Sequence, residues 1–372
     1  MDELINNIKS STDVLPSLTK LGDELRDESN RDKITQDLPT LIPHFNTFLH
    51  QKELILQTLR VMVNILAKND TNRDFMTDDT NPSVNSFWSI IKNELEFDDD
   101  VAKFVYIMFS QFIYETEHKE RYMKYLHSIK IQEKLYTSIT DESFEDIGEF
   151  LYQLLSTNEI TDNDKSFLKD LVDLNNDINE DDIGSIYVDL LELNSPQNII
   201  FEKILTKIVP CESSLVKRKL MCAASELADD DSLTVAIDTI SNTSDGYVFA
   251  ASAIVIGNGI SDRNSYEKVL KLADEQLGVM ELVKLYFNNK ITDVVQLQSI
   301  HLWINLINKE IAEEIVSRYD DDLKKFAKII GDNGQYFPEI KDLFKKFYVK
   351  LIKLTPLPID LVEYVKKSLF DE

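Results

Sequence analysis

Residues 57–68 have the sequence QTLRVMVNILAK. Leu, Val, Ile and Met fill most of it, and the polar side chains of Gln57, Arg60, Asn64 and Lys68 follow one another at intervals of three, four and four residues. This spacing places the four side chains on one narrow line along a helix that is otherwise apolar. Such a helix is typical of the inner row of a helical-repeat solenoid, because it packs against its neighbours on most sides and turns one edge toward the concave surface.

Residues 298–309, QSIHLWINLINK, repeat this design without a gap. The paired positions agree in character, except for Ala67 against Asn308. The second stretch follows the first by 241 residues, which is close to six periods of about 40 residues, a length typical of armadillo and HEAT repeats. Its polar line consists of Gln298, His301, Asn305 and Lys309.

Both lines are predicted to lie on the floor of a partner-binding groove. A third apolar stretch, residues 248–258, ends in Asn258, which matches Asn64. The alternative is a purely structural ladder, in which Asn64 and Asn305 cross-link the backbones of adjacent helices. The predicted groove residues are Gln57, Arg60, Asn64, Lys68, Asn258, Gln298, His301, Asn305 and Lys309.

Two Asn-Arg-Asp tripeptides indicate the same repeat length. They occupy residues 30–32 and 72–74, which are 42 residues apart, and each follows an apolar helical stretch. Glycine and proline number nine each among 372 residues. Their combined share is well under the average of about 12% for the two together, so turn residues are too few for a many-stranded sandwich or barrel. The sequence therefore predicts an all-α protein, an armadillo/HEAT-like helical-repeat solenoid that forms a right-handed superhelix.

Charge and pattern divide the chain into four predicted parts. Residues 1–140 are N-terminal armadillo-like repeats, residues 141–210 are acidic irregular helical repeats, residues 211–322 are armadillo-like repeats, and residues 323–372 are a basic helical cap. Sixteen acids and two lysines lie between residues 141 and 192. We predict that this zone steers a basic partner through Asp177, Glu180, Asp181 and Asp182. The alternative is a solvated surface that only aids solubility.

Composition and motifs exclude several classes of function. The net charge of −26 argues against binding to a nucleic-acid backbone, and two cysteines are too few for a disulfide framework. We expect a cytoplasmic monomer without a secretion signal or membrane span, because the longest strongly apolar stretch is only about ten residues. Phosphate-loop, dinucleotide, nucleophile-elbow and zinc motifs are absent from the sequence. We therefore expect no enzyme activity, cofactor or metal, and we interpret the aspartate runs 98–100 and 229–231 as helix-capping loops.

Three segments of the third predicted part carry a family resemblance. Residues 217–224 read KRKLMCAA, residues 237–240 read IDTI, and residues 247–258 read YVFAASAIVIGN. Together they resemble the fungal bud-emergence armadillo protein family related to SmgGDS. The Asn-Arg-Asp elements look like the repeat junctions of the same family.

The resemblance implies an armadillo-repeat protein that binds Rho- or Ras-type small GTPases. It further implies a chaperone or scaffold for their prenylated basic tails, with nucleotide exchange in some members. In this chain the acidic zone would attract such a tail, and the small apolar surface around Ala251 and Ile254 would accept a lipid chain.

Two other functions were weighed. A generic armadillo peptide-binding adaptor, of the nuclear-import or signalling-scaffold type, is the alternative. Import adaptors carry repeated Trp-xxx-Asn pairs, in which Asn stands four positions after Trp. Here Asn305 stands only two positions after Trp303. A hydrolase or transferase on a helical scaffold would need a clustered site, and the sequence does not display one.

Overall fold

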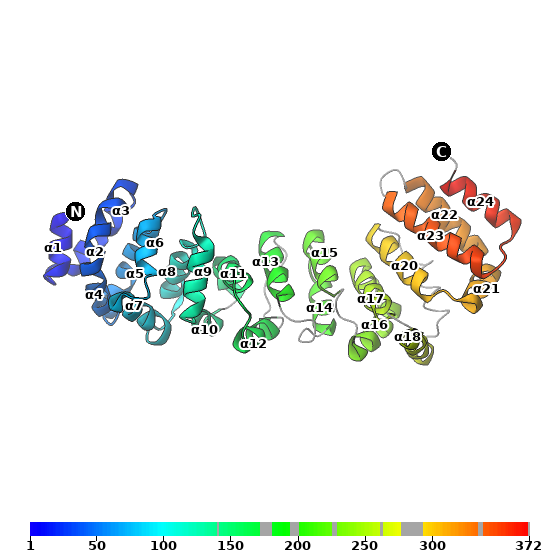
Figure 1. The fold of residues 1–372 in the computed structure, drawn as a ribbon, viewed down its shortest axis with the longest axis horizontal. Coiled ribbons are helices and arrows are strands. Elements are labelled where there is room, and N and C mark those ends of the chain that lie inside the picture. The colour runs from blue at the N-terminus through cyan, green and yellow to red at the C-terminus, as the bar shows by residue number, and fades with distance from the viewer. Residues whose placement is uncertain are drawn as a thin grey trace. The chain divides into compact units, whose positions relative to one another are not determined.

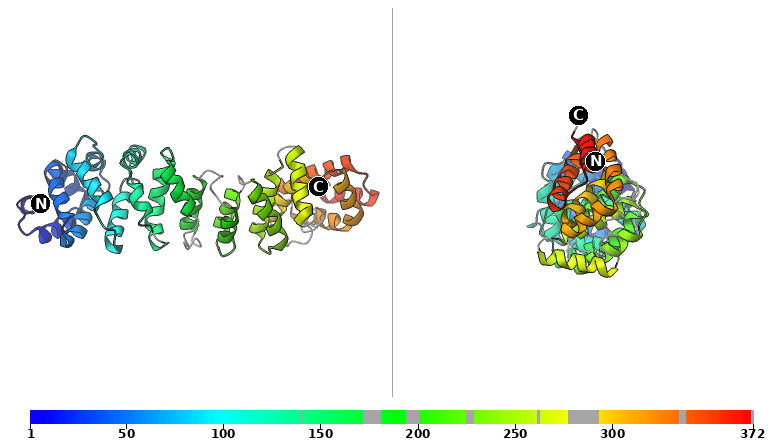
Figure 2. Two further views of the ribbon diagram at one scale, coloured as in Figure 1. Left: turned by 90° about the horizontal axis from the view of Figure 1, so that it is seen from below. Right: turned by 90° about the vertical axis from the view of Figure 1, so that its right-hand side faces the viewer.

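The computed structural model describes residues 1–139, 141–171, 181–193, 201–224, 229–260, 263–276, 293–333 and 338–370. The chain divides into two compact units, residues 1–194 and residues 195–372. Within the described residues every regular element is a helix, and Figures 1 and 2 show coiled ribbons without arrows in both units. The all-helical prediction is confirmed. The boundaries at residues 140, 210 and 322 stay predictions.

The first unit contains helices α1 to α13. They are α1 (Asp2–Lys9), α2 (Val14–Glu24), α3 (Glu28–Ile34), the 3-10 helix η1 (Thr35–Asp37), α4 (Leu38–Phe48), α5 (Lys52–Leu66), α6 (Asp70–Met76), α7 (Pro82–Asn93), α8 (Asp99–Ser110), α9 (Lys119–Ser128), α10 (Gln132–Tyr136), α11 (Asp141–Ser156), α12 (Asp162–Leu171) and α13 (Asp181–Glu192).

The second unit contains helices α14 to α24, with the numbering passing from α18 to α20. They are α14 (Phe201–Ile208), α15 (Ser214–Ala223), α16 (Asp230–Asn242), α17 (Gly246–Asn258), α18 (Arg263–Gln276), α20 (Asp293–Leu306), α21 (Lys309–Arg318), α22 (Asp320–Asn333), α23 (Pro338–Leu354) and α24 (Ile359–Leu369).

Helices of the first unit pack in two series that each skip part of the chain. In one series α2 packs on α5, α5 on α8, α8 on α11 and α11 on α13. In the other, α1 packs on α4, α4 on α7, α7 on α10 and α10 on α12. Side chains bridge several of these steps. At the α4–α7 step, Asn46 Nδ2 donates to the Ser83 carbonyl at 2.9 Å, 37 residues away. In the second unit, α17 packs on both α16 and α20, and α20 packs on α23.

Helix α5 shows why these sequences fold as they do. Leu59, Val61, Met62, Ile65 and Leu66 are fully buried, and together they cover most of the helix surface between α2 and α8. Burying an aliphatic side chain of this size stabilises the fold by about 1.5–3 kcal/mol, so the apolar sides of α5 determine its place. Helix α17 is apolar on nearly all sides and is correspondingly buried.

Side-chain caps set the starts of many helices. Asp98 accepts a hydrogen bond from the Val101 amide at 3.0 Å at the start of α8, and Asp229 accepts one from the Ser232 amide at 2.8 Å at the start of α16. A capping carboxylate satisfies one of the amides that a helix leaves without a partner in its first turn. The interpretation of both aspartate runs as capping loops is confirmed.

Candidate functional site

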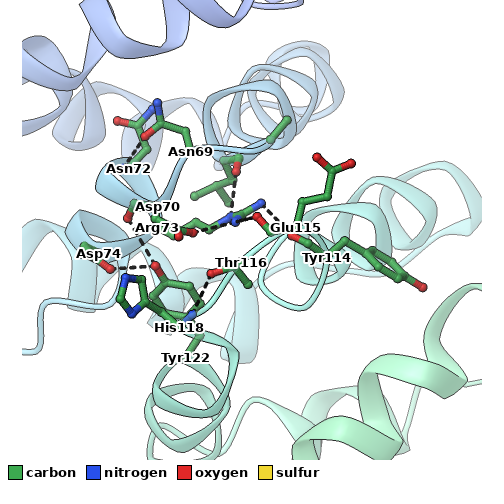
Figure 3. A network of polar contacts seen from close by, with 12 residues as sticks. Asn69, Asp70, Asn72, Arg73, Asp74, Tyr114, Glu115, Thr116, His118 and Tyr122 are labelled. Atoms are coloured by element: carbon green, nitrogen blue, oxygen red, sulfur yellow. Dashed lines mark hydrogen bonds and ion pairs between the residues drawn. The ribbon is translucent and has the colours of Figure 1, made fainter.

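A buried arginine organises the junction that follows helix α5. Arg73, on the short helix α6, is only 1% exposed. Its Nε donates to the Leu66 carbonyl at 3.0 Å, and its terminal nitrogens donate to the carbonyls of Tyr114 at 3.2 Å and Glu115 at 3.3 Å. Figure 3 shows the guanidinium lying between these groups and Asp70, whose carboxylate it contacts at 2.7 Å. Arg73 therefore binds the carbonyl ends of both α5 and the segment after α8.

Arg31 makes similar contacts 42 residues earlier in the chain. Its Nε donates to the Leu25 carbonyl and one terminal nitrogen to the Arg26 carbonyl, both at 3.0 Å. The other terminal nitrogen donates to the carbonyl of Ala67, the residue after α5. Arg31 thus lies at the carbonyl ends of α2 and α5, and Arg73 at the carbonyl end of α5, where the helix dipole favours a cation.

The two Asn-Arg-Asp tripeptides also contact each other directly. Asn72 Nδ2 donates to the Arg31 carbonyl at 3.1 Å and to the Ile65 carbonyl at 2.8 Å, and its Oδ1 accepts from the Thr35 hydroxyl at 2.7 Å. Asn72 itself is fully buried. The predicted interval of 42 residues therefore corresponds to adjacent packed positions in the first unit.

Carboxylates and a tyrosine hydroxyl lie close to Arg73, and they belong to Asp70, Asp74 and Tyr122. Burial alone would raise the pKa of Asp70, but hydrogen bonds from Thr116 and Arg73 hold it below its usual value. Burial, followed by the negative charge of Asp70, raises the pKa of Tyr122. The Tyr122 hydroxyl donates to Asp74 Oδ1 at 2.7 Å (Figure 3). The cluster therefore holds one buried cation among anions and neutral hydroxyls, as a structural junction requires.

The predicted polar line on α5 is placed beside this junction. Asn64 Nδ2 donates to the Gly22 carbonyl of α2 at 2.7 Å. Arg60 forms an ion pair with Asp23 of α2 and donates to Gln57 Oε1 at 3.3 Å. These contacts cross-link α5 to the preceding helix of its series.

Lys68 is not on the α5 helix, contrary to the sequence prediction. The helix ends at Leu66, Ala67 is extended, and Lys68 has a left-handed φ of 52°. The reason is the capping residue Asn69, which starts α6 by accepting from the Asn72 amide at 2.9 Å. The Lys68 ammonium group nevertheless reaches forward and lies 2.6 Å from Glu115 Oε1.

The second polar line lies on α20 in the other unit. Asn305 Nδ2 donates to the Gly257 carbonyl of α17 at 3.3 Å, which parallels the contact between Asn64 and Gly22. Gln298 is half-buried. Partial desolvation and then the charge of Lys346 lower the pKa of His301. The two lines belong to different units, so each forms a face by itself.

Lys309, predicted as the last residue of the second line, falls outside α20. It begins α21, because Asn308 caps that helix by accepting from the Ile311 amide at 2.8 Å. Its ammonium group lies 3.8 Å from Glu313 on its own helix. Asn258 is exposed and is the last residue of α17, and its neighbour Gly257 provides the accepting carbonyl.

Replacing Asn64 with alanine is expected to lower the free energy of unfolding by about 1 kcal/mol, because the Gly22 carbonyl loses its donor. Chemical denaturation followed by tryptophan fluorescence measures this change. Gln57→Ala is the control, because Gln57 lies on the same line but bonds to Arg60 of its own helix. Weakened partner binding with an unchanged unfolding curve would instead assign Asn64 to the groove.

The predicted acidic patch is described only in part. Asp181 and Asp182 are exposed and lie in the first turn of α13, where the helix dipole favours acidic side chains. Asp177 and Glu180 lie outside the described residues. The apolar surface around Ala251 is not accessible to a lipid, because Ala251 is fully buried. Ile254 is only half-buried.

Several residues of the first face were not found from the sequence. Asp23 and Glu115 are the acidic partners of Arg60 and Lys68, and the interval of 42 residues between the tripeptides was the available signal for their neighbourhood. Tyr114 stands out beside Glu115 with 55% of its side chain exposed. Burial of the remainder, and then the charge of Glu149, raise the pKa of Tyr114. Face 1 is defined here as Asp23, Gln57, Arg60, Asn64, Lys68, Tyr114 and Glu115.

Face 1 carries two ion pairs. Both side chains of the Lys68–Glu115 pair are more than half exposed, whereas the Arg60 side chain of the Arg60–Asp23 pair is only 20% exposed. A solvent-exposed pair contributes about 0–1 kcal/mol. Within the described residues, His, Cys, Asp and Glu side chains form no group of three or more that could hold a metal ion. No helix in that part of the chain is long and apolar enough to cross a membrane.

Comparison with known families accounts for nearly the whole chain. The family described as the BEM4 N-terminal domain matches residues 2–245. The family described as the BEM4 C-terminal domain matches residues 198–363. No curated protein matches the sequence. The resemblance found in residues 217–258 is thereby confirmed and extended to both units. The chain belongs to the BEM4 family.

Proposed function

We propose that this protein is a non-catalytic binding protein for Rho- or Ras-type small GTPases. The observation that carries the proposal is the match to both BEM4 domains over residues 2–245 and 198–363. The sequence resemblance associates this family with such GTPases. The proposal includes an armadillo/HEAT-like stack of repeats, which the two packing series of the first unit and the matched contacts of Arg31 and Arg73 support.

Face 1 is the proposed contact surface in the first unit. Tyr114 presents a large, stiff side chain of the kind that contributes strongly to protein interfaces. The exposed pair Lys68–Glu115 loses little when its two side chains exchange partners for charged groups of a GTPase. If the protein stimulates exchange, it does so by binding the nucleotide-free GTPase more tightly than the loaded form, without covalent chemistry.

The proposal is tested by binding to a panel of purified Rho and Ras GTPases. Each is assayed with and without its prenyl group, and in the GDP-bound, GTP-bound and nucleotide-free states. The expected result is affinity for at least one member that Tyr114→Ala weakens about tenfold or more. If no GTPase binds in any state, the alternative of a generic armadillo peptide-binding adaptor replaces the proposal.

Charge reversal on α13 tests the steering role of the acidic zone. Asp181→Lys together with Asp182→Lys is expected to slow association with a basic-tailed GTPase several-fold and to flatten its salt dependence, because the long-range attraction is reduced. Stopped-flow association rates at several salt concentrations measure both effects. Glu3→Lys together with Glu28→Lys, at exposed positions in the first turns of α1 and α3, changes the net charge equally and is the control. Unchanged rates would leave the acidic zone as a solvated surface.

A further inference from the structure

Helix α23 carries an exposed face that is both basic and apolar. The buried side of the helix holds Leu343, Phe344, Phe347, Tyr348 and Leu351. On the opposite side Val349 and Ile352 are each 45% exposed. Lys346 and Lys353 are exposed at positions three or four residues from Val349, so all four lie on one face of the helix.

This face continues onto α20, which packs against α23. The Lys350 ammonium group donates to the Ile304 carbonyl of α20. Lys346 lies near enough to His301 of α20 for its charge to lower the pKa of the imidazole. Face 2 is defined here as Gln298, His301, Asn305, Lys346, Val349, Lys350, Ile352 and Lys353.

The charge of face 2 is opposite to that of the chain as a whole. Helix α23 carries five lysines and two acids, whereas the protein has a net charge of −26. On this helix Lys345 pairs with Asp342 at 3.4 Å. Within the described residues no acidic side chain forms an ion pair with Lys346 or Lys353. Partial burial lowers the pKa of Lys350, whose amine donates to the Ile304 carbonyl, so Lys346 and Lys353 carry the exposed positive charge of the face.

We infer that face 2 binds an acidic peptide segment that carries aliphatic or aromatic side chains. The lysines provide charge complementarity and faster association, and Val349 and Ile352 provide apolar contact area in the centre of the charged rim. Gln298 adds its amide group, and Asn305 adds the amide oxygen that its bond to Gly257 leaves open, for hydrogen bonds with the backbone of an extended peptide. This inference goes beyond the proposed function and does not depend on GTPase binding, because face 1 and face 2 lie in different units.

A peptide fits face 2 better than a lipid surface does. Helices that bind membranes bury a broad apolar side in the lipid, often with aromatic residues. On α23 that broad side is already buried within the unit, and only two aliphatic side chains remain for contact. The amides of α20 would also lose hydrogen bonds to water on entering lipid without gaining equivalent partners.

The test measures binding of the full-length protein to a fluorescein-labelled peptide of twelve residues that alternates pairs of glutamate with pairs of leucine. Two matched peptides replace every glutamate with glutamine or every leucine with serine. The expected order of affinity places the glutamate and leucine peptide at least about tenfold above either control. Increasing the salt concentration is expected to weaken its binding strongly.

Two variants locate the binding on face 2. Lys346→Glu with Lys353→Glu is expected to weaken binding about tenfold or more through charge repulsion, and Val349→Ser with Ile352→Ser is expected to weaken it several-fold. Lys20→Glu with Lys33→Glu changes the net charge equally at exposed positions of the first unit, and should leave affinity within about twofold. Circular dichroism melting of each variant verifies that it folds.

The inference is overturned by any of three results. The glutamate and leucine peptide binds no better than its glutamine control, or the face 2 variants bind it as tightly as the original protein does. The third result is that phosphatidylserine vesicles, but not the peptide, bind the protein and lose binding in the Lys346 and Lys353 variant. That pattern would assign the face to a membrane surface.

Discussion

Replacing Arg73 with alanine is expected to lower the free energy of unfolding of the first unit by about 3 kcal/mol. The guanidinium is 1% exposed and donates to the carbonyls of Leu66, Tyr114 and Glu115. Its removal leaves these carbonyls without their donor, and it leaves the Asp70 carboxylate without its closest cation. Each lost bond to a charged donor costs about 1.5–3 kcal/mol, although shared bonds of one side chain do not add fully.

The two tryptophans allow this loss to be measured in the full chain. Trp88 lies in the first unit and Trp303 in the second, and these are the two tryptophans of the protein. In a Trp303→Phe background, urea unfolding followed by fluorescence therefore reports the first unit. Arg121→Ala is the matched control, because Arg121 pairs with Asp74 in the same network but is 56% exposed, so its loss should cost under about 1 kcal/mol. Equal effects of the two substitutions would show that Arg73 does not join the helices.

Replacing Gly331 with alanine is expected to destabilise the second unit by about 2 kcal/mol, although alanine is the better helix former. A Cβ atom at Gly331, on α22, would stand 2.3 Å from the carbonyl oxygen of Ser368 on α24. Because the neighbouring atom belongs to the backbone and not to a flexible side chain, α24 must move away from α22. The stability lost by this separation exceeds the gain of about 1 kcal/mol in helix propensity.

Hydrogen exchange of the α24 amides measures the effect directly, and faster exchange is expected in the variant. Gly22→Ala provides a control of opposite sign. A Cβ at Gly22 would meet Val61 at 3.6 Å and Arg60 at 3.7 Å, which are ordinary contacts. The change at Gly22 should therefore stabilise α2 by up to about 1 kcal/mol. A Gly331→Ala protein as stable as the original would disprove the close approach of the two helices.

The sequence predicted the helices better than it predicted where they end. The apolar stretches of residues 57–66 and 298–306 form α5 and α20 as expected, because their apolar side chains repeat with the period of a helix. Lys68 and Lys309 fitted the same spacing but lie beyond the helix ends. The capping residues Asn69 and Asn308 start new helices there, and a local cap outweighs continued periodicity.

Only the structure shows which residues contact the polar line of α5 and which side chains make up face 2. Residue spacing placed Gln57, Arg60 and Asn64 on one line, but Asp23 and Gly22 contact that line from about 40 residues away. Face 2 was not predicted, because the lysines of residues 323–367 were interpreted as a polar cap. The exposure of Val349 and Ile352 depends on which side of α23 packs against α20.

The amino-acid sequence by itself determined the helical class, the family and the interval of about 40 residues between packed positions of the first unit, because these depend on local periodicity and on recurring residues. Only the tertiary structure decided that Arg31 and Arg73 are buried between successive helices, and which charges on α5 are paired. The physical reason is that burial and pairing depend on groups brought together across about 40 residues by packing. Local sequence patterns fix which side of a helix is apolar, but not which carbonyl or carboxylate the neighbouring helix will present to it.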